Sequence, residues 1–341
     1  MILNNVVRMK GTSFKKIVSI LTTILVLQLI FTNLGYSEKI NQTTNNTIIV
    51  DIKGQGDYIS IQKAIDNAKT GSIIYVKNGE YDEIIEISKS VNLIGEDKDN
   101  TIICPTSQRN RYAMLLAYND ITISNISVYN KASGIYTSAI RIIQSDNKID
   151  NCSFFNTPIG IVIWSSNNII KNCKFWGCSD EGIALIGGNN IKCGKNSIRK
   201  CIFYDNCDGI ELQYSSENQI LDCEFYNNSH AGIDAIVSNN NKNVISNCKI
   251  YNNEAYGIYM ASSDENRIIN CELYGNQNDN IVFNQYSKDN IIFYPVCLEN
   301  QNENKVSTYK ALIKSIFEKL LDRLSISQNT RLFQYISDAN F

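Results

Sequence analysis

Acidic side chains and the only histidine of this chain recur at related places in a repeated phrase. The phrase is Gly-Ile, and it begins at Gly160, Gly182, Gly209, Gly232 and Gly257. When the repeats are aligned on it, polar residues concentrate in the central repeats, just before the glycine and two positions after it. These candidate catalytic residues are Asp180, Glu181, Asp208, Glu211, His230 and Asp234. If successive repeats stack on one another, the six side chains form one patch.

The patch has the composition of an acid–base site. Glu211 and Asp234 hold the same position in neighbouring repeats, so we expect their carboxylates to perturb each other. One carboxyl then has a raised pKa and suits general acid catalysis, while the other stays ionised. In this interpretation His230 is a second proton carrier, and Asp208 orients a charge or binds a cation. Glycoside hydrolysis, lyase chemistry and uronic acid epimerisation all need such a mixture of groups.

Two other interpretations of the patch stay open. Acidic residues on the outside of a repeat protein are often simply solvated and take no part in catalysis. Alternatively, Asp180, Cys207 and His230 share one position of successive repeats, with Cys178 close by in sequence. Carboxylate, thiolate and imidazole ligands together hold zinc or copper. Stacking alone does not establish convergent ligand geometry, so we assign no metal ligand from the sequence.

An aromatic column accompanies the patch and also has two interpretations. It lies three residues past a repeated cysteine, and its central members are Trp176, Tyr204, Tyr226 and Tyr251. Aromatic rings in adjacent repeats gain from offset packing, which favours a structural stack at a turn. The same rings would also offer sugars a flat apolar platform, so these four residues are the candidates for substrate binding.

The elements that must position these residues are short strands. The phrase Asn-x-Ile-x-x-Cys occurs six times and ends at Cys152, Cys173, Cys201, Cys223, Cys248 and Cys271. A unit of about two dozen residues, rich in β-branched residues and without a long helical pattern, is typical of one coil of a solenoid. The sequence therefore predicts an all-β parallel solenoid of about ten coils. In-register thiols on parallel strands point the same way, so we expect free cysteines and not disulfides.

The first residue of the same phrase predicts a second ladder. Its members are Asn147, Asn168, Asn196, Asn218, Asn243 and Asn266. A buried amide at a bend can bond to its own turn and to the amide one coil away. Because an unpaired buried polar group costs about 1–3 kcal/mol, such a ladder specifies the register of the coils as well as stabilising them.

The N-terminal part of the repeat region resembles a known family. The phrases Gly56-Asp57-Tyr58, Ile61-Gln62-x-Ala64-Ile65-Asp66-x-Ala68, Gly71-x-Ile73-Ile74-Tyr75-Val76 and Val91-x-Leu93-Ile94-Gly95 are similar to the opening of pectin methylesterases and other pectin-lyase-like proteins. From Asn147 onward the repeats resemble NosD-like, or CASH (carbohydrate-binding and sugar-hydrolase), repeats. The resemblance covers residues 48–297 and implies a right-handed parallel β-helix. The catalytic phrases of pectin methylesterases and polygalacturonases are absent, so neither activity is transferred, although NosD-like proteins are associated with copper.

The two ends differ from the repeats. Residues 1–36 have lysines before an apolar run and small residues after it, which predicts a cleaved signal peptide or an uncleaved N-terminal anchor. Residues 37–47 are a polar linker, and residues 48–304 are the β-helix. Ile61, Ala64 and Ile65 predict a short amphipathic helix that caps its N-terminal end, with Ser60 as N-cap and Gly71 as its end. Residues 305–341 include an amphipathic helix, interpreted as a C-terminal cap or, alternatively, as a membrane-surface or partner-binding helix.

These features lead to a functional expectation. The chain has 341 residues, a net charge of −2 and no basic block in its repeats, which excludes nucleic acid as a primary partner. We expect a secreted or extracytoplasmic protein that binds polysaccharide or a cell-surface glycan and, as an enzyme, cleaves or epimerises it. The membrane would be contacted only through an uncleaved N-terminal segment. The alternatives are a non-catalytic surface scaffold and a NosD-like metal-handling accessory, and the sequence indicates no cofactor.

Overall fold

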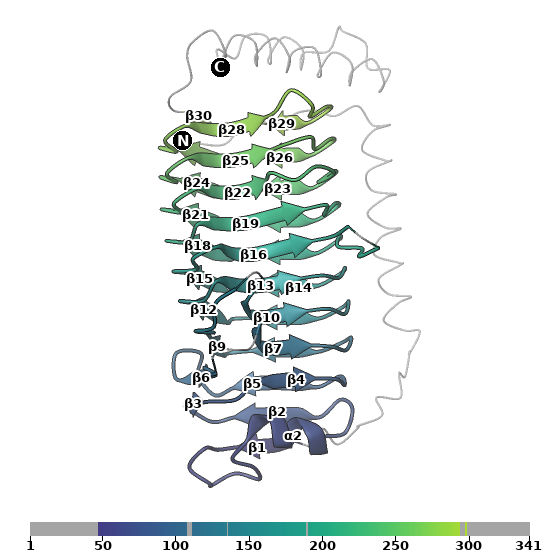
Figure 1. Ribbon diagram of the computed structural model, residues 1–341, viewed down its shortest axis with the longest axis vertical. Helices are drawn as coiled ribbons and strands as arrows, with labels where there is room; N and C mark the ends of the chain where they lie inside the picture. Colours follow the sequence, from purple (N-terminus) through teal and green to yellow (C-terminus); the bar gives the residue numbers. More distant parts are fainter. Residues whose placement is uncertain (1–46, 108–110, 135, 189, 294–296, 299–341) are drawn as a thin grey trace, which may run out of the picture. The chain divides into compact units, whose positions relative to one another are not determined.

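Short parallel strands form a stack of coils with three strands to most coils (Figure 1). The computed structural model describes residues 47–107, 111–134, 136–188, 190–293 and 297–298. Every strand pairs in parallel with the strand one coil away, which makes three sheets of 11, 10 and 9 strands, here called sheets A, B and C. This architecture is a parallel β-helix, and connections between parallel strands of one sheet are right-handed in the great majority of cases. The predicted fold class is confirmed.

The strands are given sheet by sheet. Sheet A contains β1 (Thr47–Val50), β2 (Ile73–Val76), β5 (Asn92–Gly95), β8 (Thr122–Ser124), β11 (Lys148–Asp150), β14 (Ile169–Lys171), β17 (Ser197–Arg199), β20 (Gln219–Leu221), β23 (Val244–Ser246), β26 (Arg267–Ile269) and β29 (Ile291–Phe293). Sheet B contains β3 (Gly79–Tyr81), β6 (Thr101–Ile103), β9 (Ser127–Val128), β12 (Ser153–Phe155), β15 (Lys174–Trp176), β18 (Ile202–Tyr204), β21 (Glu224–Tyr226), β24 (Lys249–Tyr251), β27 (Glu272–Tyr274) and β30 (Cys297–Leu298). Sheet C contains β4 (Ile85–Ile87), β7 (Tyr112–Leu116), β10 (Ser138–Ile142), β13 (Ile159–Ile163), β16 (Glu181–Ile186), β19 (Asp208–Gln213), β22 (Ala231–Ala235), β25 (Tyr256–Met260) and β28 (Asp279–Phe283).

The core is a set of vertical ladders of like residues. Because side chains alternate between the two faces of a strand, the middle residue of the three-residue strands in sheets A and B points inward from β8 to β27. Phe175 and Phe203 of sheet B are fully buried, and their rings stack with centroids 4.7 Å apart. The repeated cysteines are buried beside them. All ten cysteines whose side chains the structure describes are free thiols, as expected from the sequence.

The predicted asparagine ladder is present and continuous. The backbone N–H of Asn196 donates to Oδ1 of Asn218 over 3.0 Å, and the N–H of Asn218 donates to Oδ1 of Asn243 over 2.9 Å. The same pattern begins at Asn147 and continues to Asn290. Each buried amide therefore fixes the height of its own coil relative to the next.

A single helix, α2 (Ile61–Asn67), occurs among the described residues and packs against the first strands. Ser60 is its N-cap, and Ile61, Ala64 and Ile65 are buried, as predicted. The helix ends at Asn67, before the predicted Gly71, which instead lies in the following turn with a φ of +83°.

Several predictions concern residues outside this description. The signal or anchor segment 1–36 and the C-terminal helical segment 305–341 lie there, as do all but the last residue of the linker 37–47 and the end of the β-helix at residue 304. Within the described ranges, no helix has the length and apolarity needed to cross a membrane.

Candidate functional site

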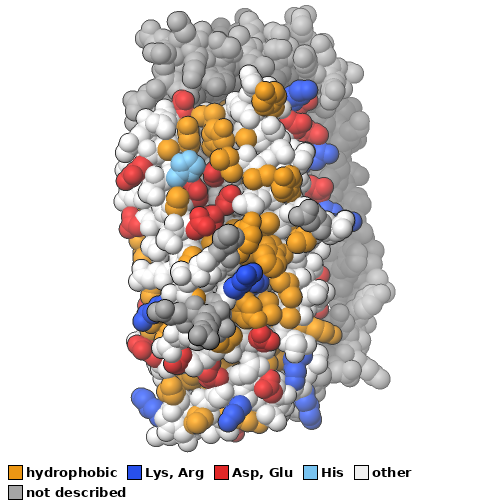
Figure 2. Space-filling model, in the orientation of Figure 1, with side chains coloured by type: hydrophobic (Ala, Val, Ile, Leu, Met, Phe, Trp, Pro, Cys, Tyr) orange, Lys and Arg blue, Asp and Glu red, His pale blue; other side chains and the backbone are white. Residues whose placement is uncertain are grey.

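The outer face of sheet C carries the predicted acidic patch. Ile183, Ile210 and Ile233 point into the core, so the residues on either side of each isoleucine face outward. The register places Glu181 beside Asp208, and Glu211 beside Asp234. Figure 2 shows red carboxylates gathered beside the pale blue histidine on this face. The predicted vertical adjacency of Glu211 and Asp234 is therefore what the structure shows.

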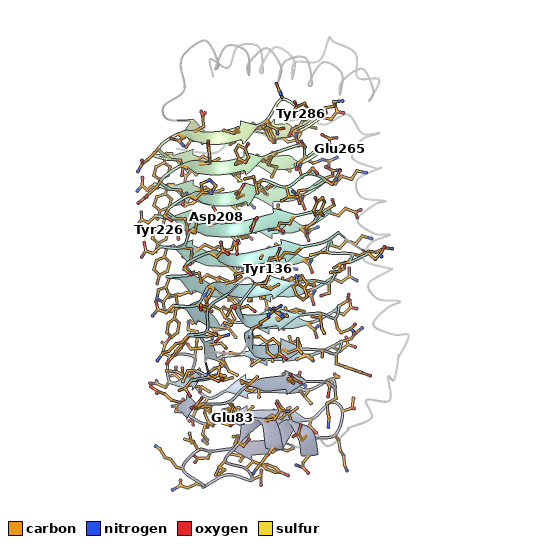
Figure 3. The ribbon with its side chains drawn as sticks, viewed as in Figure 1. Glu83, Tyr136, Asp208, Tyr226, Glu265 and Tyr286 are labelled. Carbon is orange, nitrogen blue, oxygen red and sulfur yellow. The ribbon has the colours of Figure 1, made fainter. Side chains whose placement is uncertain are left out.

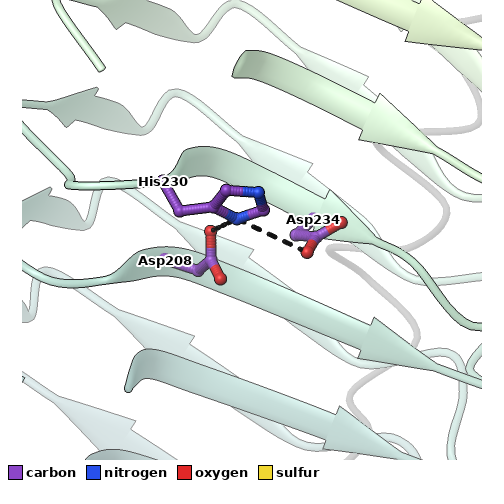
Figure 4. A group of neighbouring side chains, drawn as sticks. All are labelled: Asp208, His230 and Asp234. Carbon is purple, nitrogen blue, oxygen red and sulfur yellow. Dashed lines mark hydrogen bonds and ion pairs between the residues drawn. The ribbon is translucent and has the colours of Figure 1, made fainter. Parts of the chain in front are cut away.

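The centre of the patch is a histidine held between two carboxylates (Figure 4). His230 Nδ1 lies 2.9 Å from Oδ1 of Asp208 and 3.7 Å from Oδ2 of Asp234. The backbone N–H of Ala231 also donates to Oδ1 of Asp208, over 2.7 Å. Because the carboxylate of Asp208 can only accept, Nδ1 carries the proton in this contact. Nε2 of His230 is then free to accept a proton from another molecule.

A second asparagine ladder positions this histidine, and it was not predicted. It lies at the corner between sheets B and C, directly before β19 and β22. The N–H of Asn206 donates to Oδ1 of Asn228 over 3.2 Å, and the N–H of Asn228 donates to Oδ1 of Asn253 over 3.1 Å. Because Asp208 and His230 each follow one of these asparagines by two residues, the ladder sets their relative height. The signal was available in the sequence as an asparagine recurring five residues past each of the last four repeated cysteines, from Cys201 to Cys271.

Burial separates the patch from an ordinary charged surface. Glu181, Asp208, Glu211 and Asp234 are each at most 9% exposed, whereas His230 has a side chain 37% exposed. Carboxyl groups are seldom buried to this degree unless they are paired. Gln213 donates to Oε1 of Glu211 over 2.8 Å, but Oδ1 of Asp234 and Oε2 of Glu181 are buried without a hydrogen-bond partner among the described residues. The interpretation of a merely solvated acidic face does not fit these residues.

Burial also changes the protonation of the patch. It raises the pKa of Asp234 to about 7, with a further contribution from the negative charge of Asp208. Burial raises the pKa of Glu181 well above its ordinary value, and the adjacent carboxyl of Glu211 adds to this effect. The pKa of Asp208 is raised by burial as well, while His230 counteracts the rise. Near neutral pH Asp234 therefore exchanges between its protonated and ionised forms, which suits general acid–base chemistry.

The remaining predicted residues lie at the edge of this centre or away from it. Asp180 is exposed in the turn before β16, and its charge acts on Glu181. The set predicted as an alternative metal site does not assemble. Asp180, Cys207 and His230 are joined through their backbones, but the side chains that converge are Asp208, His230 and Asp234. This alternative set does not converge because residues two positions before the glycine lie in a turn, where in-register backbones do not make side chains converge.

The aromatic column lies on sheet B, around the corner from the patch. Figure 3 shows Tyr226 at the edge of the stack and Asp208 on the sheet C face. Its rings form the predicted stack: the rings of Trp176 and Tyr204 are 5.9 Å apart, and those of Tyr226 and Tyr251 are 5.3 Å apart. Each ring covers the faces of its neighbours, so mainly the ring edges remain for a ligand. Sugar binding by these four residues stays a prediction.

Two residues that the sequence analysis missed share the outer face of sheet C. Arg141 pairs with Val162 in the register of β10 and β13, and therefore belongs to the same outward column as Glu211 and Asp234. Trp164 follows β13, and the guanidinium carbon of Arg141 lies 4.7 Å from its ring centroid. Beside them, Ile159, Val162, Ala184 and Ile186 form a small apolar cluster with Tyr136 and Trp164. Arg141 escaped notice because β10 has Ala139 where later coils have the repeated glycine.

Sequence comparison finds matches to two protein families. Residues 47–185 match the model of the family described as Pectinesterase. A curated relative, "Probable pectinesterase 67" of Arabidopsis thaliana, is 43% identical over 74 residues. That match covers 20% of this chain and 21% of the plant protein, so the similarity is confined to about a fifth of the relative.

Comparison of structures supports the fold. A protein of Geobacillus virus E2, ORF18, superposes with a TM-score of 0.55 and 16% identity, covering 75% of this chain and 63% of the viral one. The catalytic domain of Agl-KA superposes with a TM-score of 0.51 and 14% identity, covering 69% of this chain and 53% of that domain. At such identities the likeness establishes the β-helix and nothing of its chemistry.

The match to the second family model covers more of the chain than the match to the Pectinesterase model. Residues 119–314, more than half of the chain, match the model described as Periplasmic copper-binding protein (NosD). The matched segment contains both asparagine ladders, all six repeated cysteines and the whole acidic patch. The chain therefore belongs to the NosD family.

Proposed function

We propose that the protein binds a polysaccharide along the outer face of sheet C and cleaves or epimerises it by proton transfer at the acidic patch. The observation that carries the proposal is the contact between His230 and Asp208 beside the buried carboxyl of Asp234. Asp208 orients the imidazole of His230, and the carboxyl of Asp234 lies close to both. A base and an acid are therefore next to each other on the surface. The families and folds to which the chain is similar support a role outside the cytoplasm.

Each residue has a distinct role in this proposal. Asp208 holds His230 in the tautomer with a proton on Nδ1, so Nε2 accepts a proton from the sugar or from water. Asp234, whose pKa is raised to about 7, donates a proton to the leaving oxygen or to the opposite face of the sugar carbon. Glu181 of β16 and Glu211 of β19 lie on adjacent strands beside this pair and neutralise charge that develops on the ring. The apolar cluster supplies a surface for the apolar face of a sugar.

The test is turnover of a panel of neutral and acidic polysaccharides by the purified full chain. Cleavage yields shorter oligomers in mass spectrometry. Epimerisation leaves chain length unchanged, but in D2O it adds deuterium at the inverted carbon, which mass spectrometry and proton NMR both detect. Asp234→Asn and His230→Gln should each lower the rate at least 100-fold, the lower range for loss of a general acid or base.

An exposed carboxylate on another face provides the matched control. Asp222→Asn makes the same chemical change, and it should leave the rate unaltered. If the site variants turn over as fast as the native chain, the patch is not catalytic. Absence of turnover on every polysaccharide, with retained binding, would instead support the non-catalytic scaffold.

A second candidate function is metal binding, because ligand atoms of Asp208, His230 and Asp234 all lie within 4.8 Å of one another. Copper(I) prefers thiolate and thioether ligands. The repeated thiols are buried and their Sγ atoms lie against backbone carbonyls, as in Cys201, and Met114 and Met260 are fully buried. One imidazole and two carboxylates fit copper(II) or zinc(II) instead.

Metal binding and proton transfer make opposite demands on the same nitrogen. His230 Nδ1 cannot bind a metal ion while it donates to Asp208, so loading should displace that proton. Titration of the chelator-treated chain with copper(II) and zinc(II) by calorimetry should show one site per chain, lost in His230→Ala. Zero bound metal at micromolar concentration would leave the proton-transfer proposal alone.

A further inference from the structure

Buried polar atoms without a partner concentrate on the outer face of sheet C. Five such side-chain atoms occur among the described residues, and four of them are on this face. Two are acceptors in the acidic patch, on Glu181 and Asp234. The other two are donors, Nε of Arg141 and Nε1 of Trp164. Leaving a buried polar group unpaired costs about 1–3 kcal/mol. Four such atoms on one face therefore favour a ligand that supplies the missing hydrogen bonds.

Arg141 is a buried cation without an anionic partner. Only 7% of the residue is exposed, and no ion pair to it is found in the described ranges. Its Nη2 donates to the backbone oxygens of Tyr136 over 2.6 Å and of Arg111 over 3.3 Å. The guanidinium lies between two aromatic rings, 4.7 Å from that of Trp164 and 5.4 Å from that of Tyr112.

These contacts orient the guanidinium without neutralising it. Two carbonyl oxygens and two ring faces hold its plane in place, but none of them carries a full negative charge. Burial lowers the pKa of Arg141, and the charge of a second cation, the exposed Arg111, lowers it further. Because no described residue forms an ion pair with either arginine, the two positive charges favour an anion at this position, and a planar guanidinium binds carboxylate and sulfate oxygens well.

We propose that Arg141 and Trp164 form a subsite for an anionic substituent, a carboxylate or a sulfate ester, of a polysaccharide that lies along sheet C. The inference rests on the proposed function and adds the substrate's charge to it. Arg141, Val162, Ala184 and Glu211 are in register on successive strands. At about 4.8 Å per strand, the subsite lies roughly 14 Å from Glu211.

The surface between the two ends has the character that a sugar chain needs. The apolar cluster around Val162 and Ala184 occupies the two intervening coils. Figure 2 shows an orange apolar area between the red carboxylates and a blue basic group on this face. A polymer bound along this face would place an anionic group at Arg141, apolar sugar faces on the cluster, and a reacting unit at the carboxylates. Acid and cation are thus kept three coils apart, where they do not neutralise each other.

The experiment compares polymers that differ only in charge. Binding of polygalacturonate and its methyl ester, and of dextran sulfate and dextran, is measured with the full chain and with Arg141→Leu. We expect the native chain to bind at least one charged polymer at least tenfold more tightly than its neutral counterpart. Arg141→Leu should lose this preference. Which charged polymer is preferred distinguishes a carboxylate from a sulfate ligand. Arg199→Leu, with the same charge change on sheet A, should keep it.

Thermal unfolding separates a binding role from a structural one. Arg141→Leu also removes two hydrogen bonds to backbone oxygens, so its own melting temperature reports the structural role of Arg141. The shift caused by ligand reports binding: the preferred charged polymer should raise the melting temperature of the native chain and leave that of Arg141→Leu unchanged. Equal binding of charged and neutral polymers, equal binding by Arg141→Leu, or an equal ligand-induced shift in both proteins would overturn the subsite.

The experiments distinguish failure of the anionic subsite from failure of the proposed catalytic function. Turnover of a neutral polysaccharide that Arg141→Leu leaves intact would reject the subsite and keep the catalytic patch. Arg141-dependent binding of an acidic polymer without any turnover would keep the subsite and reject catalysis.

Discussion

Replacing Asp234 by asparagine tests the central electrostatic claim, because the amide keeps the shape of the carboxyl and cannot ionise. Burial raises the pKa of Asp234 from 3.8 to about 7. Between these values the folded chain keeps the proton that the unfolded chain releases. The stability that Asp234 contributes is thus fully present below about pH 4 and is lost as the pH rises through about 7. A shift of about three units corresponds to up to about 4 kcal/mol, at 1.36 kcal/mol per unit.

The assay is equilibrium urea unfolding of the native chain and of Asp234→Asn, in a chelating buffer, at several values between pH 4 and pH 8. The difference in unfolding free energy between the two proteins should change by up to about 4 kcal/mol across this range, in favour of the variant at pH 8. Asp222→Asn, a control at an exposed carboxylate, should show a much smaller change. The claim is that burial disfavours the ionised form of Asp234. It would be refuted if the difference in unfolding free energy stayed constant with pH, or if it favoured the native chain at pH 8.

Three further predictions concern the scaffold. Asn218→Ala should lower the unfolding free energy by roughly 1–3 kcal/mol for each buried partner left unpaired. The reason is that the Asn218 side chain accepts hydrogen bonds from the backbone and the side-chain amide of Asn196. The shift of the urea midpoint measures this loss. Gly182→Ala should destabilise by about 1–3 kcal/mol, because a Cβ there would lie 2.7 Å from a ring carbon of Phe203; loss of melting temperature checks it. Cys207, the one described cysteine that is not buried, should react with a maleimide in the native chain while the other nine react only after unfolding, as peptide mapping will show.

Most of the architecture follows from spacing, and the reason is physical. In a parallel, in-register stack, residues one repeat apart lie one strand apart, so the phrase containing Asn218 and Cys223 predicted both ladders of sheet A. The same argument placed Glu211 beside Asp234 without knowledge of any side-chain contact. Spacing succeeds wherever a residue sits within a strand, because the sheet then dictates its direction.

The parts that spacing missed depend on turns and on burial. The contact between His230 and Asp208 joins a turn residue to the first residue of a strand, and the turn's conformation decides it. Equal spacing put Cys207 in the same column, yet its side chain is not part of the cluster. Arg141 was missed because its coil lacks the glycine on which the others were aligned. Burial of the acidic patch could not be predicted either, since it depends on how closely the outer side chains of sheet C cover one another.

The buried polar groups that destabilise the fold gather on sheet C, which supports a site there. On sheet A, and at the corner between sheets B and C, the ladders satisfy their own polar groups, as when Asn228 bonds to both Asn206 and Asn253. In the part of the chain that the structure describes, the carboxyl groups whose pKa values burial raises above their ordinary values all lie on sheet C, which also holds Arg141, a buried cation without an anionic partner there. A scaffold selected only for stability would lose nothing by replacing Asp234 with an apolar residue such as the valine that occupies its column two coils after it, Val282. The destabilising residues therefore support the proposed binding site on sheet C.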